Sequence, residues 1–339
     1  MIDADVHVAP ASVDDLAPYL GDYWVDYVAN AELSMSPSLQ GAYPPAALHG
    51  EVPTGVEGLR AELLDADGGP ERAVLSCLAA FDVSHNAYFE AALCRAVNDW
   101  MRVELLEREP RLAASLALPT LDPVAAAEEI ERLGPHPQFV QALLPIRTDA
   151  PYGNPRYHPI YAAAERHGIP IGLHAWGRAA YSPTTSGFAG SYLQDYVSNS
   201  QVTVQAHVTS LVSEGVFERF PGLRVVLAEC GFAWLPFLLW RFDKDWKALW
   251  REVPWVKERP SAYVRRHVLA TTAPAQLPED RATIEWLAEM IDAPDVLLYA
   301  SDHPHRHGGG IEPLLETLGD DGRAAVLHGN AAALYGLAA

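Results

Sequence analysis

Cysteine is scarce in this chain. Only three occur among 339 residues, at Cys77, Cys94 and Cys230, and no two of them have CxxC spacing. This pattern argues against a disulfide framework and against a thiolate zinc site. Cys77 and Cys94 are expected to be small core residues. Cys230 directly follows Glu229 and could line a site, but core packing is the simpler expectation.

Positive charge and long apolar runs are also in short supply. The chain has 24 Lys and Arg against 44 Asp and Glu, a formal net charge of −20. This excess of negative charge argues against nucleic acid and anionic membranes as partners. No apolar stretch approaches the ~18 residues of a membrane-spanning helix. The first predicted strand begins at Ile2, with no leader peptide before it, so we expect a cytoplasmic protein.

The residues that are present predict strands alternating with helices. Continuous apolar, β-branched runs are typical of parallel strands buried on both faces. Asp122 is expected to cap one intervening helix and Gly168 to end another. The alternation predicts a (β/α)₈ TIM-like barrel, with residues 1–339 as one domain. An open doubly wound sheet is the alternative, but no glycine-rich phosphate loop follows the first strand. The expected strands are 2–8, 73–79, 113–118, 138–144, 169–174, 202–207, 223–229 and 296–301.

Three segments exceed a minimal barrel: 18–60, 176–200 and 232–268. Each follows an expected strand, so we expect long loop insertions on the catalytic face, where such loops commonly act as lids. The segment 232–268 is rich in tryptophan and could instead form a dimer surface, because aromatic residues are enriched in interfaces. A homodimer is therefore the default expectation.

Five polar residues stand at or near the ends of expected strands. They are Asp5, His7, His174, His207 and Asp302. Carboxylate and imidazole groups at the C-terminal ends of barrel strands are the usual ligands of a Zn²⁺ or Mn²⁺ active site. As core residues, all five would need buried hydrogen-bond partners. Their joint placement therefore predicts one divalent metal ion at the top of the barrel and a small-molecule substrate beside it.

Several motifs resemble the amidohydrolase superfamily, in particular the amidohydrolase 2 branch. IDADVH resembles the opening strand motif, LHAWG and QAHVTSL resemble the fifth- and sixth-strand motifs, and FPGLRVVLAECGFAWLPFLLWRFD resembles the seventh-strand segment. LLYASDHPH and LHGNAAALYGL, the most specific of these motifs, resemble the eighth strand and the last helix. That branch includes aminocarboxymuconate-semialdehyde decarboxylase, γ-resorcylate decarboxylase and related aromatic-acid decarboxylases.

The resemblance implies roles for the strand-end residues. Asp5, His7, His174 and Asp302 would bind one divalent metal ion. His207 would be either a further ligand or an acid/base over the substrate. Asp5 departs from the family's usual His or Glu, which leaves Zn²⁺ and Mn²⁺ both open. Gln141 stands where two-metal members carry a carboxylated lysine, which favours a mononuclear site.

Other side chains near strand ends are candidates for substrate contact. An arginine there could fork onto a substrate carboxylate, although a solvated surface arginine is an equal expectation. A tryptophan could form an aromatic wall, and a glutamate could orient a ligand histidine. The candidates are Arg147, Trp176, Arg178, Glu229, His303 and His305.

Three functions fit these residues. The first is a metal-dependent decarboxylase of an aromatic or unsaturated acid, in which Asp302, with a raised pKa, delivers a proton and His207 polarises the substrate. The second is a metal-dependent hydrolase of an amide, ester or lactone, with Asp302 as base and His207 at the developing oxyanion. The third is a barrel that binds a ligand without turnover. The first two share their ligands, so pocket character is the feature expected to separate them.

Overall fold

The computed structural model describes most of the chain. It covers residues 1–31, 52–81, 85–177, 199–307 and 309–337, and between 178 and 198 only positions 187, 191, 193, 194 and 197. Side chains at 176, 177, 199 and 200 are outside the description.

One parallel sheet organises the molecule, with its strands hydrogen-bonded in chain order from β1 to β8. Val6 of β1 forms a parallel bridge to His303, just beyond β8, and this contact closes the sheet into the predicted barrel. We call this contact between β1 and residues 299–303 the seam. The strands are β1 (Ile2–His7), β2 (Arg72–Ser76), β3 (Leu112–Ala117), β4 (Phe139–Arg147), β5 (Ile171–Gly177), β6 (Val225–Ala228), β7 (Val268–Thr271) and β8 (Leu297–Leu298).

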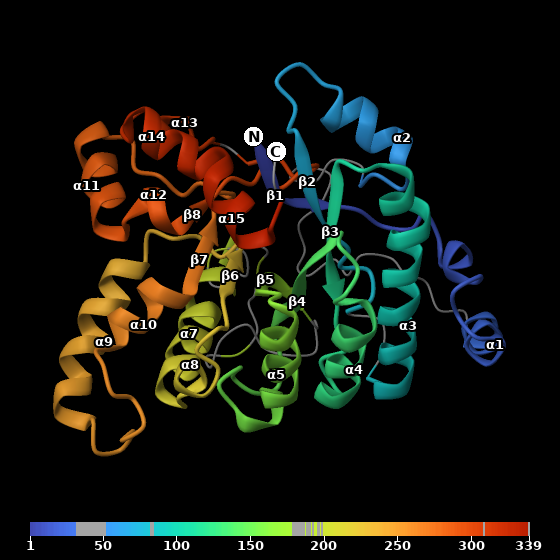
Figure 1. Ribbon diagram of the computed structural model, residues 1–339, viewed down its shortest axis with the longest axis horizontal. Helices are drawn as coiled ribbons and strands as arrows, with labels where there is room; N and C mark the ends of the chain where they lie inside the picture. The colour runs from blue at the N-terminus through green and yellow to red at the C-terminus, as the bar shows by residue number, and fades with distance from the viewer. Residues whose placement is uncertain are drawn as a thin grey trace.

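Helices surround the sheet (Figure 1). Asp122 caps α4 through hydrogen bonds from Val124 N–H and Ala125 N–H, and Gly168 ends α5 with φ 66°, both as predicted. The main helices are α1 (Asp22–Ala31), α2 (Val56–Leu59), α3 (Ala87–Trp100), α4 (Pro123–Leu133), α5 (His158–His167), α7 (Val204–Ser213), α8 (Val216–Arg219), α9 (Leu235–Leu249), α10 (Pro260–His267), α11 (Arg281–Ile291), α12 (Ala293–Val296), α13 (Glu312–Leu315), α14 (Gly319–Ala324) and α15 (Asn330–Tyr335). Shorter 3₁₀ or π segments are η1 (Val13–Leu16), η3 (Arg60–Leu64), η4 (Met101–Leu105), η5 (Leu106–Arg108), η6 (Pro155–Tyr157), η7 (Asn199–Thr203) and η8 (Ala325–Gly329).

One predicted strand is wrong. Residues 202–207 belong to η7 and α7, and the run predicted as the seventh strand is β6. The apolar side chains of α7 recur at Val204, Val208, Leu211 and Val212, all buried, which is the spacing of one helical face. The short stretch VTVQAH contains β-branched residues and alternates apolar with polar residues, which is typical of a strand. It is too short to show the helical period.

The missing strand is β7, a run of only four residues within VLATTAP. It follows the segment 232–268, which was predicted to be a loop insertion. That prediction is wrong, because most of the segment forms α9 and α10, the helical connection between β6 and β7. The segment 18–60 contains α1 and α2, with residues 32–51 outside the description, and most of 176–200 also lies outside it.

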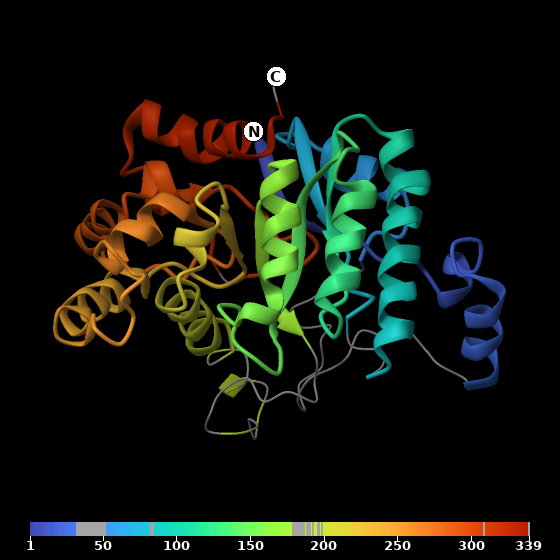
Figure 2. The ribbon, with the colours of Figure 1, turned by 60° about the horizontal axis from the view of Figure 1, so that its bottom comes forward.

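The N-terminal end of the barrel is closed by the last helix. Ala331 and Tyr335 of α15 pack into an apolar cluster with Ile2, Val74 and Val226 from the sheet. The Tyr335 hydroxyl donates to Gln141 Oε1 at 2.9 Å. The N-terminus lies at this end (Figure 2), and the strands finish at the opposite end. No helix in the described ranges is both long and apolar enough to cross a membrane.

Candidate metal centre

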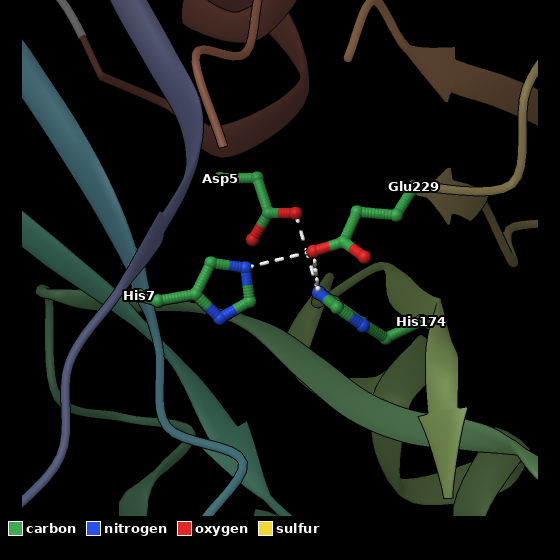
Figure 3. Close-up of side chains that lie close together, drawn as sticks. All are labelled: Asp5, His7, His174 and Glu229. Carbon is green, nitrogen blue, oxygen red and sulfur yellow. Dashed lines mark hydrogen bonds and ion pairs between the residues drawn. The ribbon is translucent and has the colours of Figure 1, made fainter. Parts of the chain in front are cut away.

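The four predicted metal ligands converge at the C-terminal end of the barrel. Asp5 and His7 lie on β1, His174 on β5, and Asp302 follows β8 at the seam. All four are buried. Glu229, which follows β6, joins them (Figure 3). We call Asp5, His7, His174, Glu229, Asp302 and His305 the ligand cluster.

A β-bulge aims Asp5 at the centre. Asp3 pairs with Ala73 and Val6 with Leu75, so β1 carries one extra residue between these pairs. Such a bulge shifts the alternation of side chains and is common beside active sites. The hydroxyl of Ser76 on β2 then donates to Asp5 Oδ1 at 2.7 Å, which orients the carboxylate.

The donor atoms of the ligand cluster lie close together. His7 Nε2 lies 2.8 Å from Glu229 Oε1 and 2.8 Å from Asp302 Oδ1. His174 Nε2 lies 3.3 Å from Asp5 Oδ2 and 3.4 Å from Glu229 Oε1. Within each of two overlapping groups, Asp5–His7–His174–Glu229 and His7–Glu229–Asp302–His305, the donor atoms lie within 4.8 Å of one another. Because both groups use His7 and Glu229, they describe one centre rather than two.

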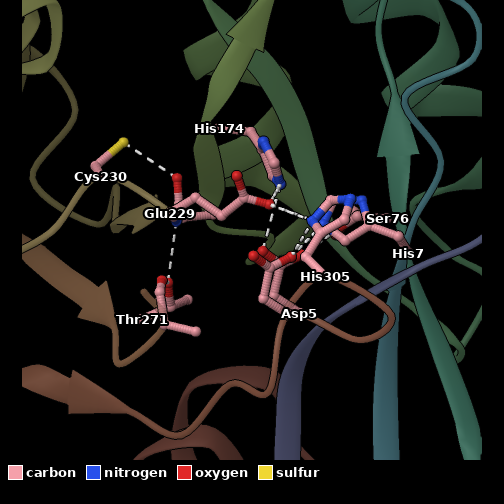
Figure 4. A network of polar contacts seen from close by, with 12 residues as sticks. Asp5, His7, Ser76, His174, Glu229, Cys230, Thr271 and His305 are labelled. Atoms are coloured by element: carbon pink, nitrogen blue, oxygen red, sulfur yellow. Dashed lines mark hydrogen bonds and ion pairs between the residues drawn. The ribbon is translucent and has the colours of Figure 1, made fainter. Parts of the chain in front are cut away.

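Two histidines beyond the strand hold the Asp302 carboxylate. His305 Nδ1 lies 2.7 Å from Oδ1, and His307 Nε2 lies 2.5 Å from Oδ2. His305 also stacks obliquely on His7, with ring centroids 4.4 Å apart. Figure 4 shows His305 close to the carboxylates of Asp5 and Glu229, beside His7 and His174.

Glu229 and Asp302 have left-handed backbone conformations. Their φ angles are 55° and 59°, a region that non-glycine residues seldom occupy and that costs about 1–3 kcal/mol. The amide of Glu229 donates to the Thr271 hydroxyl at 3.1 Å and helps to fix this conformation. Strain at two residues of one cluster is typical of a functional site.

The electrostatics of the ligand cluster are those of crowded carboxylates. Burial would lower the pKa of His7 and of His174, but the neighbouring carboxylates outweigh burial and raise both. Burial would raise the pKa of Asp302, but hydrogen bonds from three histidines hold it well below its ordinary value. Burial and the charge of Asp302 oppose ionisation of Glu229, yet the imidazoles bring its pKa to about 2. The direction at Asp302 is opposite to the raised pKa that its predicted acid role required.

Two buried donor atoms test whether a metal fits. Asp5 Oδ2 and His174 Nε2 lie 3.3 Å apart at an ion-pair distance, and neither makes a hydrogen bond within the part of the chain that the structure describes. An unsatisfied buried polar atom costs about 1–3 kcal/mol, and a cation satisfies such atoms directly. Imidazole nitrogens and carboxylate oxygens are suitable donors for Zn²⁺ or Mn²⁺. The residues therefore fit one divalent metal ion.

His207 lies apart from the ligand cluster, on α7 rather than at a strand end. Its Nδ1 accepts from Tyr152 N–H at 3.2 Å, so Nε2 carries the proton and donates to the Ile146 carbonyl at 2.7 Å. Burial lowers the pKa of His207 to about 4, which keeps the ring neutral. With both nitrogens bonded to backbone, His207 connects α7 to the end of β4 in this structure.

The other predicted substrate residues are more scattered. Arg147 is buried at the end of β4. His303 and His305 line a cavity of about 420 Å³ together with Glu62 and Arg306. The lining mixes acidic and basic groups and includes no Phe, Tyr or Trp among the described residues, so it lacks the predicted aromatic character. Arg178 and the Trp176 side chain lie outside the described part of the chain.

Ser76 and His307 were not predicted from the sequence. Glu229 was predicted to contact substrate or to orient a ligand histidine, and its contact with His7 at 2.8 Å agrees with the second role. The histidine spacing in HPHRH was a visible signal for His307, because it repeats the offset between His303 and His305. For Ser76 there was no local signal, because its contact with Asp5 spans 71 positions in the sequence.

A closed (β/α)₈ barrel with carboxylates and imidazoles gathered at its strand ends defines a class of metal-dependent barrel proteins. The family model described as "Amidohydrolase" matches residues 2–337, and the chain belongs to this family, in the amidohydrolase 2 branch.

Similar proteins include several aromatic-acid decarboxylases. The chain is 32% identical to the γ-resorcylate decarboxylase of Rhodococcus jostii (strain RHA1) over 196 residues, which cover 53% of this chain and 58% of that protein. The match thus spans less than two thirds of that relative's length.

Solved structures match over the full length. The 5-carboxyvanillate decarboxylase LigW from Sphingomonas paucimobilis has a TM-score of 0.71 and 23% identity, over 100% of this chain and 99% of that one. A dihydroxybenzoic acid decarboxylase from Polaromonas sp. JS666, solved with bound manganese, has a TM-score of 0.68 and 21% identity, over 99% and 96%. At these identities the structures establish the fold.

Proposed function

We propose that this protein is a metal-dependent decarboxylase that removes CO₂ from an aromatic carboxylic acid. The observation that carries the proposal is the ligand cluster, in a chain similar to γ-resorcylate decarboxylase. His7 Nε2 and His174 Nε2, together with the converging carboxylates, supply the donors for one ion. The reaction is R–COO⁻ + H⁺ → R–H + CO₂, so the protein must bind the carboxylate and deliver one proton to the carbon that loses CO₂.

The metal ion would be held by Asp5, His7, His174 and Asp302. When bound, a divalent ion would attract the oxygens of an acid substrate and balance its charge. Carboxylates are hard donors and are numerous in the ligand cluster, which favours Mn²⁺ over Zn²⁺. The manganese bound to the Polaromonas neighbour supports the same choice.

The chain's own side chains would bind the substrate and move the proton. Arg147, buried at the end of β4, would hold the substrate carboxylate through its planar guanidinium. His305 is the better proton donor than Asp302, because it hydrogen-bonds to the Asp302 carboxylate and faces the cavity beside the ligand cluster. Asp302 would then hold the His305 ring in place.

Hydrolysis is a second candidate, favoured by two observations. The described lining of the cavity includes no aromatic Phe, Tyr or Trp side chain. Glu229 is an ionised carboxylate inside the ligand cluster, where it could accept a proton from an attacking water. In this alternative an amide, ester or lactone bond would be cleaved at the same ion.

Incubation of Mn²⁺-loaded protein with a panel of hydroxybenzoates tests the proposal. Release of CO₂ and the matching phenol, coupled one to one, is the expected result. The variant His305→Gln should lose most of the rate, because its side chain cannot supply the proton, while it still binds Mn²⁺. Turnover of esters or amides without CO₂ release would favour hydrolysis and contradict the decarboxylase proposal.

We also infer a homodimer formed through the outer face of α9. Phe237 and Trp240 are exposed there, with ring centroids 5.4 Å apart, and Trp286 of α11 is exposed as well. Exposed aromatic patches mark interfaces. Light scattering should give twice the chain mass of 37.0 kDa, and Trp240→Glu should halve it. Tyr23→Glu, at an exposed site on α1, is the matched control that should stay dimeric.

A cytoplasmic location remains part of the proposal. All three cysteines are buried and free, as expected in a reducing compartment.

A further inference from the structure

The seam that closes the barrel joins two segments that carry metal-ligand candidates. Ala4 N–H donates to the Tyr299 carbonyl at 2.8 Å, and His7 N–H donates to the His303 carbonyl at 2.8 Å. Between them, Asp302 N–H donates to the Asp5 carbonyl at 3.2 Å. The backbones of Asp5 and Asp302 are therefore bonded directly to each other across this ladder.

The ladder of the seam is irregular at Ser301. In a regular parallel ladder, the bond from Ala4 N–H to the Tyr299 carbonyl would be followed by one from Ser301 N–H to the Ala4 carbonyl, but the next bond runs from Asp302 N–H to the Asp5 carbonyl. Both Ser301 N–H and Asp5 N–H instead donate to one oxygen, Oδ1 of Asp3, at 2.9 and 3.3 Å. The buried Asp3 carboxylate thus takes the place of the missing ladder acceptor for Ser301 and also accepts from the amide of Asp5, so it contacts both sides of the seam.

We propose that Asp3 is a positioning residue that sets the spacing of Asp5 and Asp302 for the metal ion. Its carboxylate bonds to the amide of Asp5 itself and to the amide directly before Asp302. The role rests on the metal centre proposed above. It does not require Asp3 to touch the ion or the substrate.

The cost of burying Asp3 supports a role beyond stability. Asp3 is 1% exposed, and its second oxygen, Oδ2, has no hydrogen-bond partner among the described residues. A buried carboxylate that is only partly satisfied is expensive, and an apolar side chain often serves a core equally well. What an apolar side chain cannot do is accept two amide hydrogens at the seam.

Two substitutions separate positioning from stability. Asp3→Asn keeps an oxygen that can accept both amides, whereas Asp3→Ala removes it. The affinity for Mn²⁺ is measured by competition with a chromogenic chelator, alongside thermal unfolding of the metal-free proteins. Asp3→Asn should bind Mn²⁺ close to the wild-type affinity, and Asp3→Ala should bind at least about tenfold more weakly, the range seen when groups that orient metal ligands are removed. Glu109→Gln, far from the seam, should unfold at a lower temperature and keep its affinity.

The outcomes that overturn the proposal are distinct. Unchanged affinity in folded Asp3→Ala would eliminate the positioning role and leave the metal centre standing, whereas a wild-type protein that binds no Mn²⁺ would overturn both. If Asp3→Ala does not fold, hydrogen exchange of the wild-type protein decides the matter. Ser301 N–H exchanging as slowly as the ladder amides of Ala4 and His7 supports the seam contact, and fast exchange at Ser301 overturns it.

Discussion

Two clusters in this barrel use buried carboxylates in opposite ways. In the ligand cluster, carboxylates and imidazoles are crowded together, and Asp5 Oδ2 and both His174 nitrogens have no hydrogen-bond partner among the described residues. The second cluster, which we call the Glu109 cluster, consists of Arg60, Asp65, Glu109 and Arg111 and lies before β3. There, Glu109 Oε2 accepts from Arg60 at 2.7 Å and from Arg111 at 3.0 Å, while Oε1 accepts from Arg111 side-chain and backbone N–H groups.

The difference shows which cluster serves function. A satisfied carboxylate between arginines stabilises the fold, whereas unsatisfied donors held together by strained backbone destabilise it and persist where a ligand satisfies them. Buried charge alone does not identify a site. A functional site is identified by whether its buried charged groups have hydrogen-bond partners. The two clusters should therefore respond differently to mutation, one in Mn²⁺ affinity and the other in unfolding free energy.

The largest effect is expected from His174→Leu, which keeps the side-chain volume but removes both nitrogens. Mn²⁺ binding should be lost, while the metal-free variant should change its unfolding temperature little, because the unsatisfied ring nitrogens and the imidazole charge that faces Asp5 and Glu229 are removed together. In the wild type, Mn²⁺ at about 100 times its Kd should add about 2.7 kcal/mol of stability, and the variant should gain none. Thermal unfolding with and without Mn²⁺ measures both effects. A strongly destabilised metal-free variant would contradict the claim that the ligand cluster does not stabilise the fold.

Glu109→Gln should behave in the opposite way. Loss of the charged hydrogen bonds should cost about 2 kcal/mol of unfolding free energy at neutral pH, with Mn²⁺ affinity unchanged. The arginine hydrogen bonds lower the pKa of Glu109 from 4.5 to about 2, so its stabilisation is complete above pH 4.5 and disappears as the pH falls toward 2. Urea unfolding of both proteins across this range should show the difference shrinking, and a constant difference would contradict the assignment.

A smaller effect is expected from Ser76→Ala. Without the hydroxyl that donates to Asp5 Oδ1, Mn²⁺ affinity should fall about 10- to 100-fold. Ser115→Ala is the matched control, since the Ser115 hydroxyl is also buried in the barrel but accepts from Gln141 rather than contacting a ligand. Chelator competition on both variants measures the contrast, and equal affinities would show that Ser76 has no orienting role.

Sequence reasoning predicted the barrel and brought Asp5, His7, His174 and Asp302 to one end of it, because periodicity and strand-end position are local properties. It failed at 202–207, where the window was too short to separate strand from helix, and His207 was misplaced with it. The strand β7 was not predicted, because it has only four residues and directly follows a helix.

The other features of the site depend on contacts that no local pattern in the sequence encodes. Glu229 reaches His7 across 222 positions of sequence, from a left-handed backbone that residue type does not predict. The expected proton donor, Asp302, was assigned from its position alone. Its pKa depends on His305 and His307, whose orientations only the folded chain fixes.

The most direct test of the account is to locate the ion. Crystals of the Mn²⁺-loaded protein, measured at the manganese absorption edge, should show one anomalous peak per chain within bonding distance of His7 Nε2, His174 Nε2 and the carboxylates of Asp5 and Asp302. No peak at the ligand cluster, or a peak elsewhere, would contradict the assignment of this cluster as a metal centre.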